Sequence, residues 1–332
     1  MSIGLAMTAA AALVAAMGTD AGADGGFAVP PEFRTEIARK LASPLSLASY
    51  CNVIETSSNS LSIPTEETTP WQPTGGIQAY WENEAAPIPP TKPLLSQATL
   101  RLNKLSCLVP VSDELIEDAT ALASYLEGKA ADKLIAKLNT AIIAGTGAGQ
   151  PQGILKSTSL ITVTKETTPT TQANGTVILP NIVNVWTRVL GSWRKNAVWL
   201  VNDDVIPQLD LLDFRKDNAA ATTIPVYLPR NSISDQGYDT LKGRPVIPCD
   251  ASPALGQPGD IILADLQQYL LAVKTHDGAP IKENVSIHLY FDQGLTAFRF
   301  VMRVAGAPSW RDTVTLPNSS MPRSWATTLE AR

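Results

Sequence analysis

Two residue types that carry much of protein chemistry are scarce in this sequence. Among 332 residues there are two histidines, His276 and His288, and three cysteines, Cys51, Cys107 and Cys249. No two of these cysteines have the spacing of a metal site, and an odd number argues against a closed set of disulfides. We interpret the cysteines as reduced thiols of a cytosolic product. The shortage of histidine weighs against zinc chemistry and histidine-based catalysis.

Charge is also scarce. Charged residues make up 17% of the chain, and 26 basic residues against 31 acidic ones leave a formal charge of −5. This balance excludes a strongly basic protein that binds nucleic acid through charge alone. Hydrophobic residues make up 44%, which excludes a disordered chain. The length suits about two domains of roughly 150 residues, with a core that needs no disulfide or metal.

No hydrophobic run reaches the length of a membrane span. The apolar stretch at residues 5–17 has 13 residues, whereas a spanning helix needs about 20. No lysine or arginine precedes Arg34, so the basic region of a signal peptide is missing. We interpret residues 1–26 as an alanine-rich arm with a flexible linker at 18–26, and we expect no membrane partner.

Proline, by contrast, is abundant in one segment. Seven of the 30 residues from 64 to 93 are proline, and Gly75-Gly76 lies among them. Proline lacks an amide donor and fixes φ, which excludes a regular helix and argues against a central strand. The segment nevertheless carries large apolar side chains, so two interpretations are open: an arm that contacts a neighbouring molecule, or a loop folded onto its own core. These side chains are Trp71, Ile77, Tyr80, Trp81 and Ile88.

Strand patterns flank this segment. Residues 47–64 read as strands joined by a Ser-Ser-Asn-Ser turn. We expect strands 61–66 and 97–111 to form a long hairpin whose tip is the proline-rich segment. The apolar alternation changes parity near Asn103-Lys104, which predicts a β-bulge there.

Helical patterns come next. Helices are expected at 31–40, 113–119, 124–144, 181–194 and 203–212, the second capped by Ser112 and the last by Asp203. Ser124 and Glu127 form a capping box for the helix at 124–144. Its apolar stripe consists of Leu126, Ala130, Leu134, Leu138 and Ile142, and Gly145 ends it.

The remaining pattern is mostly short strands. A threonine-rich hairpin is expected at 156–176, ending at Asn174-Gly175. Further strands are expected at 197–201, 224–228, 244–248, 260–264, 268–274, 285–291 and 296–304. Without repeats or a βαβ series, the fold class is α+β.

The chemical motifs fail their context tests. The segment 145–149 is glycine-rich like a phosphate loop, but it follows a helix and is followed by Gln150-Pro151. There is no G-x-S-x-G elbow, and His276 and His288 lie in a turn and on a strand face. Neighbouring acidic residues occur at Glu66-Glu67, Glu82/Glu84 and Asp203-Asp204. We interpret them as helix caps or solvent-exposed side chains, and not as catalytic pairs. The residues thus indicate no enzyme, with no catalytic, cofactor or metal site.

Several segments, in order over about residues 28–305, resemble the major capsid proteins of tailed bacteriophages, which have the Hong Kong 97-type fold. The segments are Val29–Phe33, Leu61–Pro64, Trp81–Ala86, Leu105–Asp118, Ala141–Leu155, Gly243–Val246 and Leu263–Leu266. Each is weak alone, but their shared order is specific. The resemblance implies an α+β capsid fold with an N-terminal arm, an extended β-hairpin loop, a peripheral domain with a long spine helix, and an axial domain.

The resemblance also implies boundaries for these parts. They are an arm at 1–30, a peripheral domain at 31–60 and 98–200 with its spine helix at 124–144, an extended loop at 61–97, an axial domain at 201–292, and a return to the peripheral domain at 293–332. The extended loop would lie over the next subunit. The expected contacts with that subunit are Trp71, Ile77, Tyr80, Trp81, Glu82, Glu84 and Ile88.

The function implied is self-assembly. Subunits would form hexamers and pentamers, and then an icosahedral shell around double-stranded DNA bound without sequence specificity. The implied partners are other copies of the chain, a scaffold protein or protease, a portal protein and decoration proteins. The implied location is the virion, assembled in the cytoplasm of a bacterial host. Because only about 27 residues precede the match, scaffolding is either a separate protein or a removed segment. No cross-link is assigned to Lys92 or Lys104.

Two alternatives remain at this point. One is an encapsulin-like compartment shell, which has the same fold but encloses enzymes. The other is a hydrolase that uses His276 or His288. Fold resemblance alone does not separate shells that differ in content.

Overall fold

The computed structural model describes residues 45–72, 75–84, 87–113, 122–167, 171–212, 227–228, 239–275 and 279–332. The expected N-terminal arm, the helix at 31–40 and most of the helix at 113–119 lie outside these ranges. So do His276 and the first part of the strand expected at 224–228.

A five-stranded sheet is built around the longest strand, β13, and its order is β1-β11-β13-β12, with β4 on the other side of β13. Its strands are β1 (Asn52–Thr56), β4 (Asn103–Ser112), β11 (Tyr269–Lys274), β12 (Ile281–Tyr290) and β13 (Leu295–Pro308). The alternation in β13 orients Phe298, Phe300 and Met302 inward, where all three are buried. The strand expected at 296–304 is confirmed within β13, and the one at 285–291 is confirmed within β12 up to Tyr290, since Phe291 begins a 3₁₀ turn.

A second, seven-stranded sheet has the order β5-β16-β10-β6-β9-β8-β7. Its strands are β5 (Ile161–Val163), β6 (Val198–Val201), β7 (Tyr227–Leu228), β8 (Thr240–Leu241), β9 (Arg244–Pro248), β10 (Ile261–Ala264) and β16 (Ala326–Leu329). The central strands β6 and β10 are uninterrupted apolar runs, and every residue in them is buried. Such runs are typical of strands covered on both faces.

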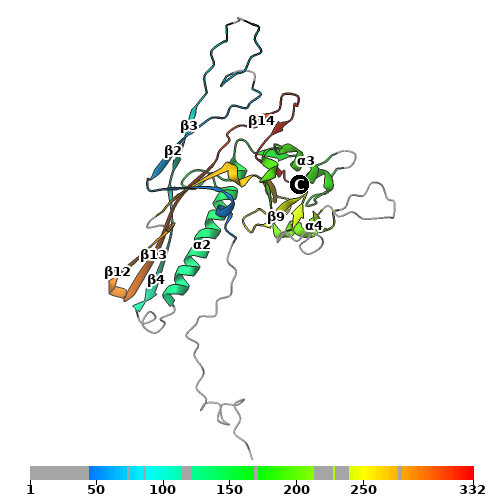
Figure 1. Ribbon diagram of the computed structural model, residues 1–332. Coiled ribbons are helices and arrows are strands. Elements are labelled where there is room, and N and C mark those ends of the chain that lie inside the picture. Colours follow the sequence, from blue (N-terminus) through cyan, green and yellow to red (C-terminus); the bar gives the residue numbers. More distant parts are fainter. Residues whose placement is uncertain are drawn as a thin grey trace, which may run out of the picture.

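The helices of the described ranges are α2 (Leu122–Ala144), α3 (Leu179–Arg188) and α4 (Ile206–Asp210). Short 3₁₀ turns occur at Leu47–Tyr50, Ile154–Lys156, Trp193–Lys195, Asp203–Val205, Leu266–Gln268 and Phe291–Gln293. α2 rises over about 35 Å and packs along β4 and β13 (Figure 1). Its predicted stripe is confirmed, since Ala130, Leu134, Leu138 and Ile142 are buried.

The expected start of α2 was wrong. The helix is already formed at Leu122, so Ser124 lies inside it and is not its N-cap. Leucine and alanine at 122–123 are strong helix formers, and they carry the helix past the capping-box signal. The predicted end is confirmed, because α2 stops at Ala144, before Gly145.

The long hairpin is confirmed only in its outer part. β2 (Ser60–Thr65) pairs antiparallel with β3 (Ser96–Arg101), from Ser60 opposite Arg101 to Thr65 opposite Ser96. At Leu102 the chain changes partner, and β4 continues in the five-stranded sheet beside β13. The parity change read from the sequence therefore marks a switch of sheets. The turn at 57–59 joins β1 and β2, which also belong to different sheets.

Three further expectations were wrong in part. α3 ends at Arg188, because Val189 forms a bridge with Ser324 and the chain leaves the helix. The described part of 156–176 forms no hairpin; β5 pairs in parallel with β16. Asn202, and not Asp203, caps the turn that leads into α4, its Oδ1 accepting from the Asp204 amide at 2.9 Å.

Sheet membership cuts across the domain boundaries expected at residues 201 and 293. β5 precedes residue 201, β6 spans 198–201 and β16 follows residue 293, yet all three lie in the seven-stranded sheet. β11 and β12 lie between those boundaries, but they belong to the five-stranded sheet. Strand pairing brings together segments that are distant in sequence, and no local pattern marks such pairing.

Figure 1 shows three parts of the molecule. α2 and the five-stranded sheet form an elongated body at the lower left. The seven-stranded sheet and its helices form a compact unit at the right, where the chain ends. The β2–β3 hairpin continues upward into a long loop that projects away from both.

Candidate functional site

The projecting loop starts from a well-anchored base. On one face of the hairpin, Leu100 is buried with Leu270 and Ala272 of β11. Further out, the hydroxyls of Thr65 and Ser96 lie 2.8 Å apart across the two strands. The hairpin therefore holds both ends of the loop at fixed positions on the body.

Trp71 belongs to this base. Its indole Nε1 donates a hydrogen bond to the carbonyl oxygen of Thr315 at 2.6 Å, and its half-buried ring packs against the main core cluster. Thr315 lies on β14 (Val314–Thr315), which pairs with β15 (Pro322–Arg323). In the single chain, Trp71 thus contacts its own body, which corresponds to the second interpretation of the loop for this residue.

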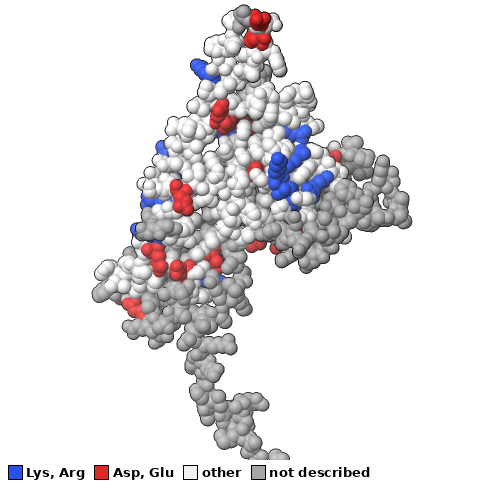
Figure 2. Space-filling model, viewed as in Figure 1, with Lys and Arg blue, Asp and Glu red and all other residues white. Residues whose placement is uncertain are grey.

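The other candidate residues project into solvent. Ile77 is 72% exposed, Tyr80 51%, Trp81 105% and Ile88 78%. Glu82 and Glu84 are exposed as well. The described residues from 66 to 95 form no helix or strand, as the prolines predict. Figure 2 shows a largely uncharged loop with acidic side chains at its tip.

An exposed apolar surface of this kind is costly for an isolated chain and typical of a binding surface. Six of the seven candidate residues therefore share one projecting loop, and Trp71 lies apart at its base. Leu94 and Leu95, 62% and 65% exposed, belong to the same surface and were not predicted. The sequence could have indicated them, because two adjacent leucines just before β3 do not follow the alternation that would bury one of them in a sheet.

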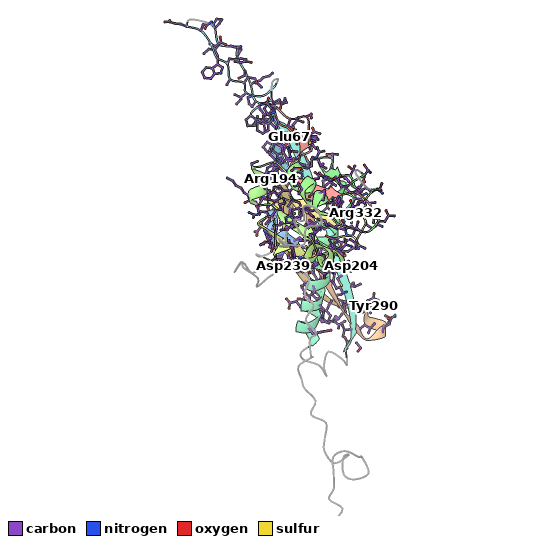
Figure 3. All side chains as sticks on the ribbon, turned by 90° about the vertical axis from the view of Figure 1, so that its right-hand side faces the viewer. Glu67, Arg194, Asp204, Asp239, Tyr290 and Arg332 are labelled. Carbon is purple, nitrogen blue, oxygen red and sulfur yellow. The ribbon has the colours of Figure 1, made fainter. Side chains whose placement is uncertain are left out.

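An open groove lies beside the base of the loop. Its volume is about 850 Å³, and Trp71 and Leu94 line one wall while Trp310 and Leu316 line the other. Glu67 also lines it, and its Oε1 is buried with no hydrogen-bond partner in the described part of the chain. Figure 3 places Glu67 where the loop joins the body. The groove continues the loop surface onto the body.

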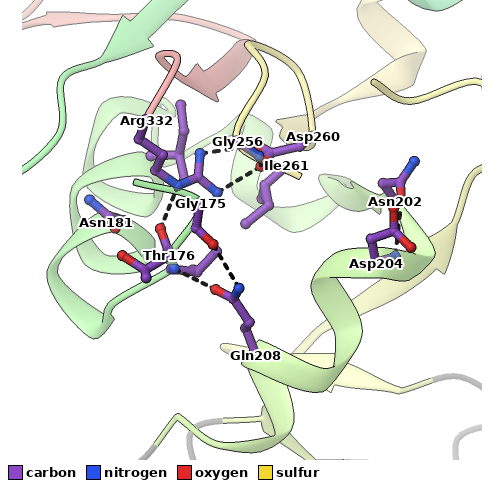
Figure 4. A network of polar contacts seen from close by, with 12 residues as sticks. Gly175, Thr176, Asn181, Asn202, Asp204, Gln208, Gly256, Asp260, Ile261 and Arg332 are labelled. Atoms are coloured by element: carbon purple, nitrogen blue, oxygen red, sulfur yellow. Dashed lines mark hydrogen bonds and ion pairs between the residues drawn. The ribbon is translucent and has the colours of Figure 1, made fainter. Parts of the chain in front are cut away.

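A buried polar network ties the end of the chain to the compact unit (Figure 4). The Arg332 guanidinium forms an ion pair with Asp260 at 2.8 Å, and its Nε donates to the Thr176 carbonyl at 2.6 Å. The Gly175 amide donates to the Arg332 carbonyl at 2.9 Å. Both charged side chains are almost fully removed from water, so this network holds the fold and offers no open site.

Perturbed titratable groups also have structural causes. Burial raises the pKa of the Cys51 thiol to about 12. Burial likewise raises the pKa of Asp265, whose carboxylate caps the turn that follows it. Burial and a hydrogen bond to Asp239 raise the pKa of Tyr227. None of these groups adjoins a histidine in the described ranges, and their burial accounts for the shifts.

The enzymatic motifs gain no support from the geometry. His288 is exposed on β12, and its imidazole makes no hydrogen bond with another described residue. The segment after α2 closes on itself, since the Gly147 amide donates to Pro151 and the Gly153 amide to Gly145. No group of three metal-ligating side chains is assembled within the described ranges.

None of the described helices is both long enough and apolar enough to cross a bilayer.

The molecule thus combines a body, in which a long helix packs beside a sheet, with a projecting loop (Figure 1) whose apolar side chains are exposed. Solved capsid structures share this arrangement. The capsid of the native GTA particle aligns with a TM-score of 0.70 at 19% identity, over 94% of this chain and 98% of that chain. Chains of Mycobacterium phage Adephagia and Microbacterium phage Oxtober96 align with TM-scores of 0.62 and 0.63.

The two phage chains are 14% and 13% identical to this one. Each alignment covers 93% of this chain, with 97% of the Adephagia chain and 98% of the Oxtober96 chain. No curated protein matches the sequence. At such low identity the likeness shows the fold, which is the α+β Hong Kong 97-type capsid fold.

The family model described as "Phage capsid family" matches residues 25–316, and the chain belongs to that family. It is a major capsid subunit of a phage head shell and a component of the virion. The predicted family, fold class and head-shell function are thereby confirmed. The compartment shell and the hydrolase gain no support from these matches.

Proposed function

We propose that the chain assembles through hexamers and pentamers into a closed icosahedral shell around double-stranded DNA. Membership of the phage capsid family supports a shell, and the exposed loop carries the proposal for how subunits join. Repeated modest contacts, made at once by every subunit, suffice for a stable shell. The chain acts in this proposal as a structural protein without catalytic activity.

The observation that carries the proposal is the surface of the loop. Ile77, Trp81 and Ile88 are more than two-thirds exposed and contact no core of their own. Covering them with the next subunit would remove apolar surface from water at about 25 cal/mol per Å². The proposed contact residues remain Trp71, Ile77, Tyr80, Trp81, Glu82, Glu84 and Ile88. Trp71 would then act from the base of the loop.

The two sheets support a revised assignment of domains. The unit with α2 and the five-stranded sheet would be the peripheral domain, with α2 as its spine helix. The unit with the seven-stranded sheet would be the axial domain, packed around five-fold and six-fold centres. The axial domain would then include β5, β6 and β16, outside the limits of 201–292 read from the sequence.

The proposed partners follow from assembly. The main partners would be other copies of the chain, and a portal protein and decoration proteins would join the same shell. A scaffold protein or a protease would act during assembly in the cytoplasm of the bacterial host. DNA would be enclosed without sequence specificity, and the net charge of −5 would limit adhesion of the shell to it.

Deleting residues 68–92 tests the proposal. Because Thr65 and Ser96 are paired, the residues left between them, 66–67 and 93–95, can close a hairpin of about five loop residues. We expect a folded, soluble subunit that forms no shells in negative-stain electron microscopy and light scattering. Normal shells from this variant would contradict the proposed role of the loop.

A second variant separates loop contacts from loss of Trp71. Replacing residues 77–88 by a glycine-serine segment of equal length keeps Trp71 and its bond to Thr315. This variant should also fail to assemble while unfolding at the same temperature as wild type. The content of wild-type particles then distinguishes a phage head, which holds DNA, from a compartment, which holds cargo proteins.

A further inference from the structure

Basic side chains gather at the C-terminal end of α3. Arg188 ends the helix, Arg194 and Lys195 follow in the next turn, and Arg323 comes from β15. The two segments are joined there, since the Ser324 amide donates to the Arg188 carbonyl at 2.9 Å. We call Arg188, Arg194 and Arg323, with Lys195 beside them, the arginine patch. Figure 2 shows basic side chains gathered over α3, and Figure 3 shows Arg194 on the body below the loop base.

The positive charge of the patch is not compensated within the described chain. No carboxylate among the described residues forms an ion pair with these arginines. Arg194 instead donates to the carbonyls of Thr187 and Val189, at 3.2 and 3.0 Å, and lies over the Trp186 ring. Burial and the charge of Arg323 lower the pKa of Arg194. Clustered like charges that repel one another form a ready site for an anion.

Arg323 adds an independent observation. Its Nε is buried and has no hydrogen-bond partner among the described residues, although Arg323 itself is only half-buried. A buried donor without an acceptor costs about 1–3 kcal/mol, and native proteins seldom leave one unpaired. Arg323 also pairs with no carboxylate of the described residues, so the exposed part of its guanidinium is available to an anion of another molecule.

The loop tip has the opposite charge. Glu82 and Glu84 are exposed there, next to Trp81, which has no contact that shields it from water. The tip points away from the body, so it cannot reach the arginine patch of its own chain (Figures 1 and 2). Only a second copy can bring the two surfaces together.

We propose that the loop tip of one subunit docks on the arginine patch of its neighbour, with the carboxylates of Glu82 and Glu84 between Arg188 and Arg323. In this contact Trp81 lies against the part of the Trp186 side chain that Arg194 and Trp199 leave exposed. The inference rests on the proposed role of the loop and adds the surface that receives it. Arginine suits this task because its guanidinium binds carboxylates through paired hydrogen bonds.

Nucleic acid is the competing anion, and the observations favour the loop tip. The tip is a fixed acidic and aromatic element on a projecting hairpin, matched to a small patch that contains both arginine and tryptophan. The patch also consists of only four basic residues within a chain of net charge −5. Binding DNA through charge alone calls for a broader basic surface.

A charge-swap experiment tests the contact in the full-length chain, under conditions in which wild type forms shells. One variant is Glu82→Arg/Glu84→Arg, the second is Arg188→Glu/Arg323→Glu, and the third combines all four. Arg194 stays, because it bonds to the end of α3. Each single-sided variant should raise the concentration needed for assembly by about tenfold or more, and the combination should return it to within about threefold of wild type.

A control variant tests whether the effect depends on these particular residues or only on the total charge. Lys133→Glu/Lys137→Glu changes the same amount of charge on the exposed side of α2 and should not be rescued by the tip variant. If Arg323→Glu prevents folding, Arg188→Glu/Lys195→Glu replaces it. Rescue in the combined variant supports the contact. Failure of rescue overturns it, as would shells that form normally but hold less DNA.

The same series separates this inference from the proposed function. If deletion of residues 68–92 blocks assembly while the charge variants assemble normally, only the arginine patch contact is overturned. If the deletion variant assembles normally, the proposed role of the loop fails as well.

Discussion

At the scale of single residues, one ion pair shows how a charge is kept inside this fold. The Arg332 and Asp260 side chains are 1% and 0% exposed, and two nitrogen–oxygen contacts of 2.8 and 3.2 Å join them. The Gly256 amide donates a further hydrogen bond to the Asp260 carboxylate, at its Oδ2 atom, at 2.9 Å. Desolvation of both charges is offset only because every partner is present.

Removing one member of this ion pair should therefore lower the stability of the fold. We expect Asp260→Ala to lower the free energy of unfolding by about 3–5 kcal/mol, because the Arg332 guanidinium stays buried without its counter-charge. Urea unfolding of dissociated subunits measures this loss. The exposed Asp250 provides the control, since Asp250→Ala should change stability by less than about 0.5 kcal/mol. Equal effects at both positions would contradict the structural role of the pair.

At the scale of elements, the segment that ends α2 depends on backbone contact. The Gly145 amide still bonds to Ala141 in the helix, while its carbonyl accepts from the Gly153 amide at 2.8 Å. The Gln152 amide donates to Gly306 of β13 at 2.8 Å, which joins this segment to the five-stranded sheet. A glycine-rich run that resembled a phosphate loop thus connects the long helix to the sheet beside it.

This close approach predicts the effect of adding a methyl group. A Cβ at Gly145 would collide with the carbonyl oxygens of Pro151 and Ala141, which are backbone atoms and cannot rotate away. Gly145→Ala should lower the unfolding free energy by about 1–3 kcal/mol. Gly191→Ala is the matched control, because a Cβ there meets nothing within 4 Å. Thermal unfolding compares them, and a loss no larger at Gly145 than at Gly191 would count against the contact.

At the scale of the whole molecule, two tryptophans of the same loop have different surroundings. Trp71 donates to Thr315 and packs against the core, whereas Trp81 is 105% exposed. The stability of the subunit and its assembly should therefore respond to different side chains. This difference tests the fold and the shell contact separately.

We expect Trp81→Ala to leave the unfolding temperature of the subunit unchanged and to weaken shell formation, because its ring is covered only by a neighbour. Trp71→Ala should lower the unfolding temperature, since an aromatic ring and a hydrogen bond to the body are lost. Calorimetry of subunits and light scattering of shells measure the two effects. If Trp81→Ala lowered subunit stability as much as Trp71→Ala, the loop would fold onto its own chain.

Much of the fold could be read from local patterns. The stripe of α2 is buried at Leu134 and Leu138, β6 is buried throughout, and the proline-rich segment has no regular structure in its described residues. These features depend on periodicity and on the covalent geometry of proline, which act over a few residues. The exposed contact candidates were not settled in this way, because the residues alone left open whether the segment contacts a neighbour or its own core, and the family resemblance supplied the choice.

Local patterns could not predict which strands pair with each other or which distant segments come into contact. Two contacts join segments far apart in the chain: the pairing of β16 with β10, and the bridge of Val189 with Ser324, which ends α3. The same bridge brings the backbone of Arg188 beside that of Ser324. Such contacts are selected by packing over the whole core, and a strand carries no mark of its partner. Local chemistry settles the type of most segments, but tertiary contacts set limits such as the end of α3 at Arg188. The assembled fold decides which sheet each strand enters and which scattered arginines become one surface.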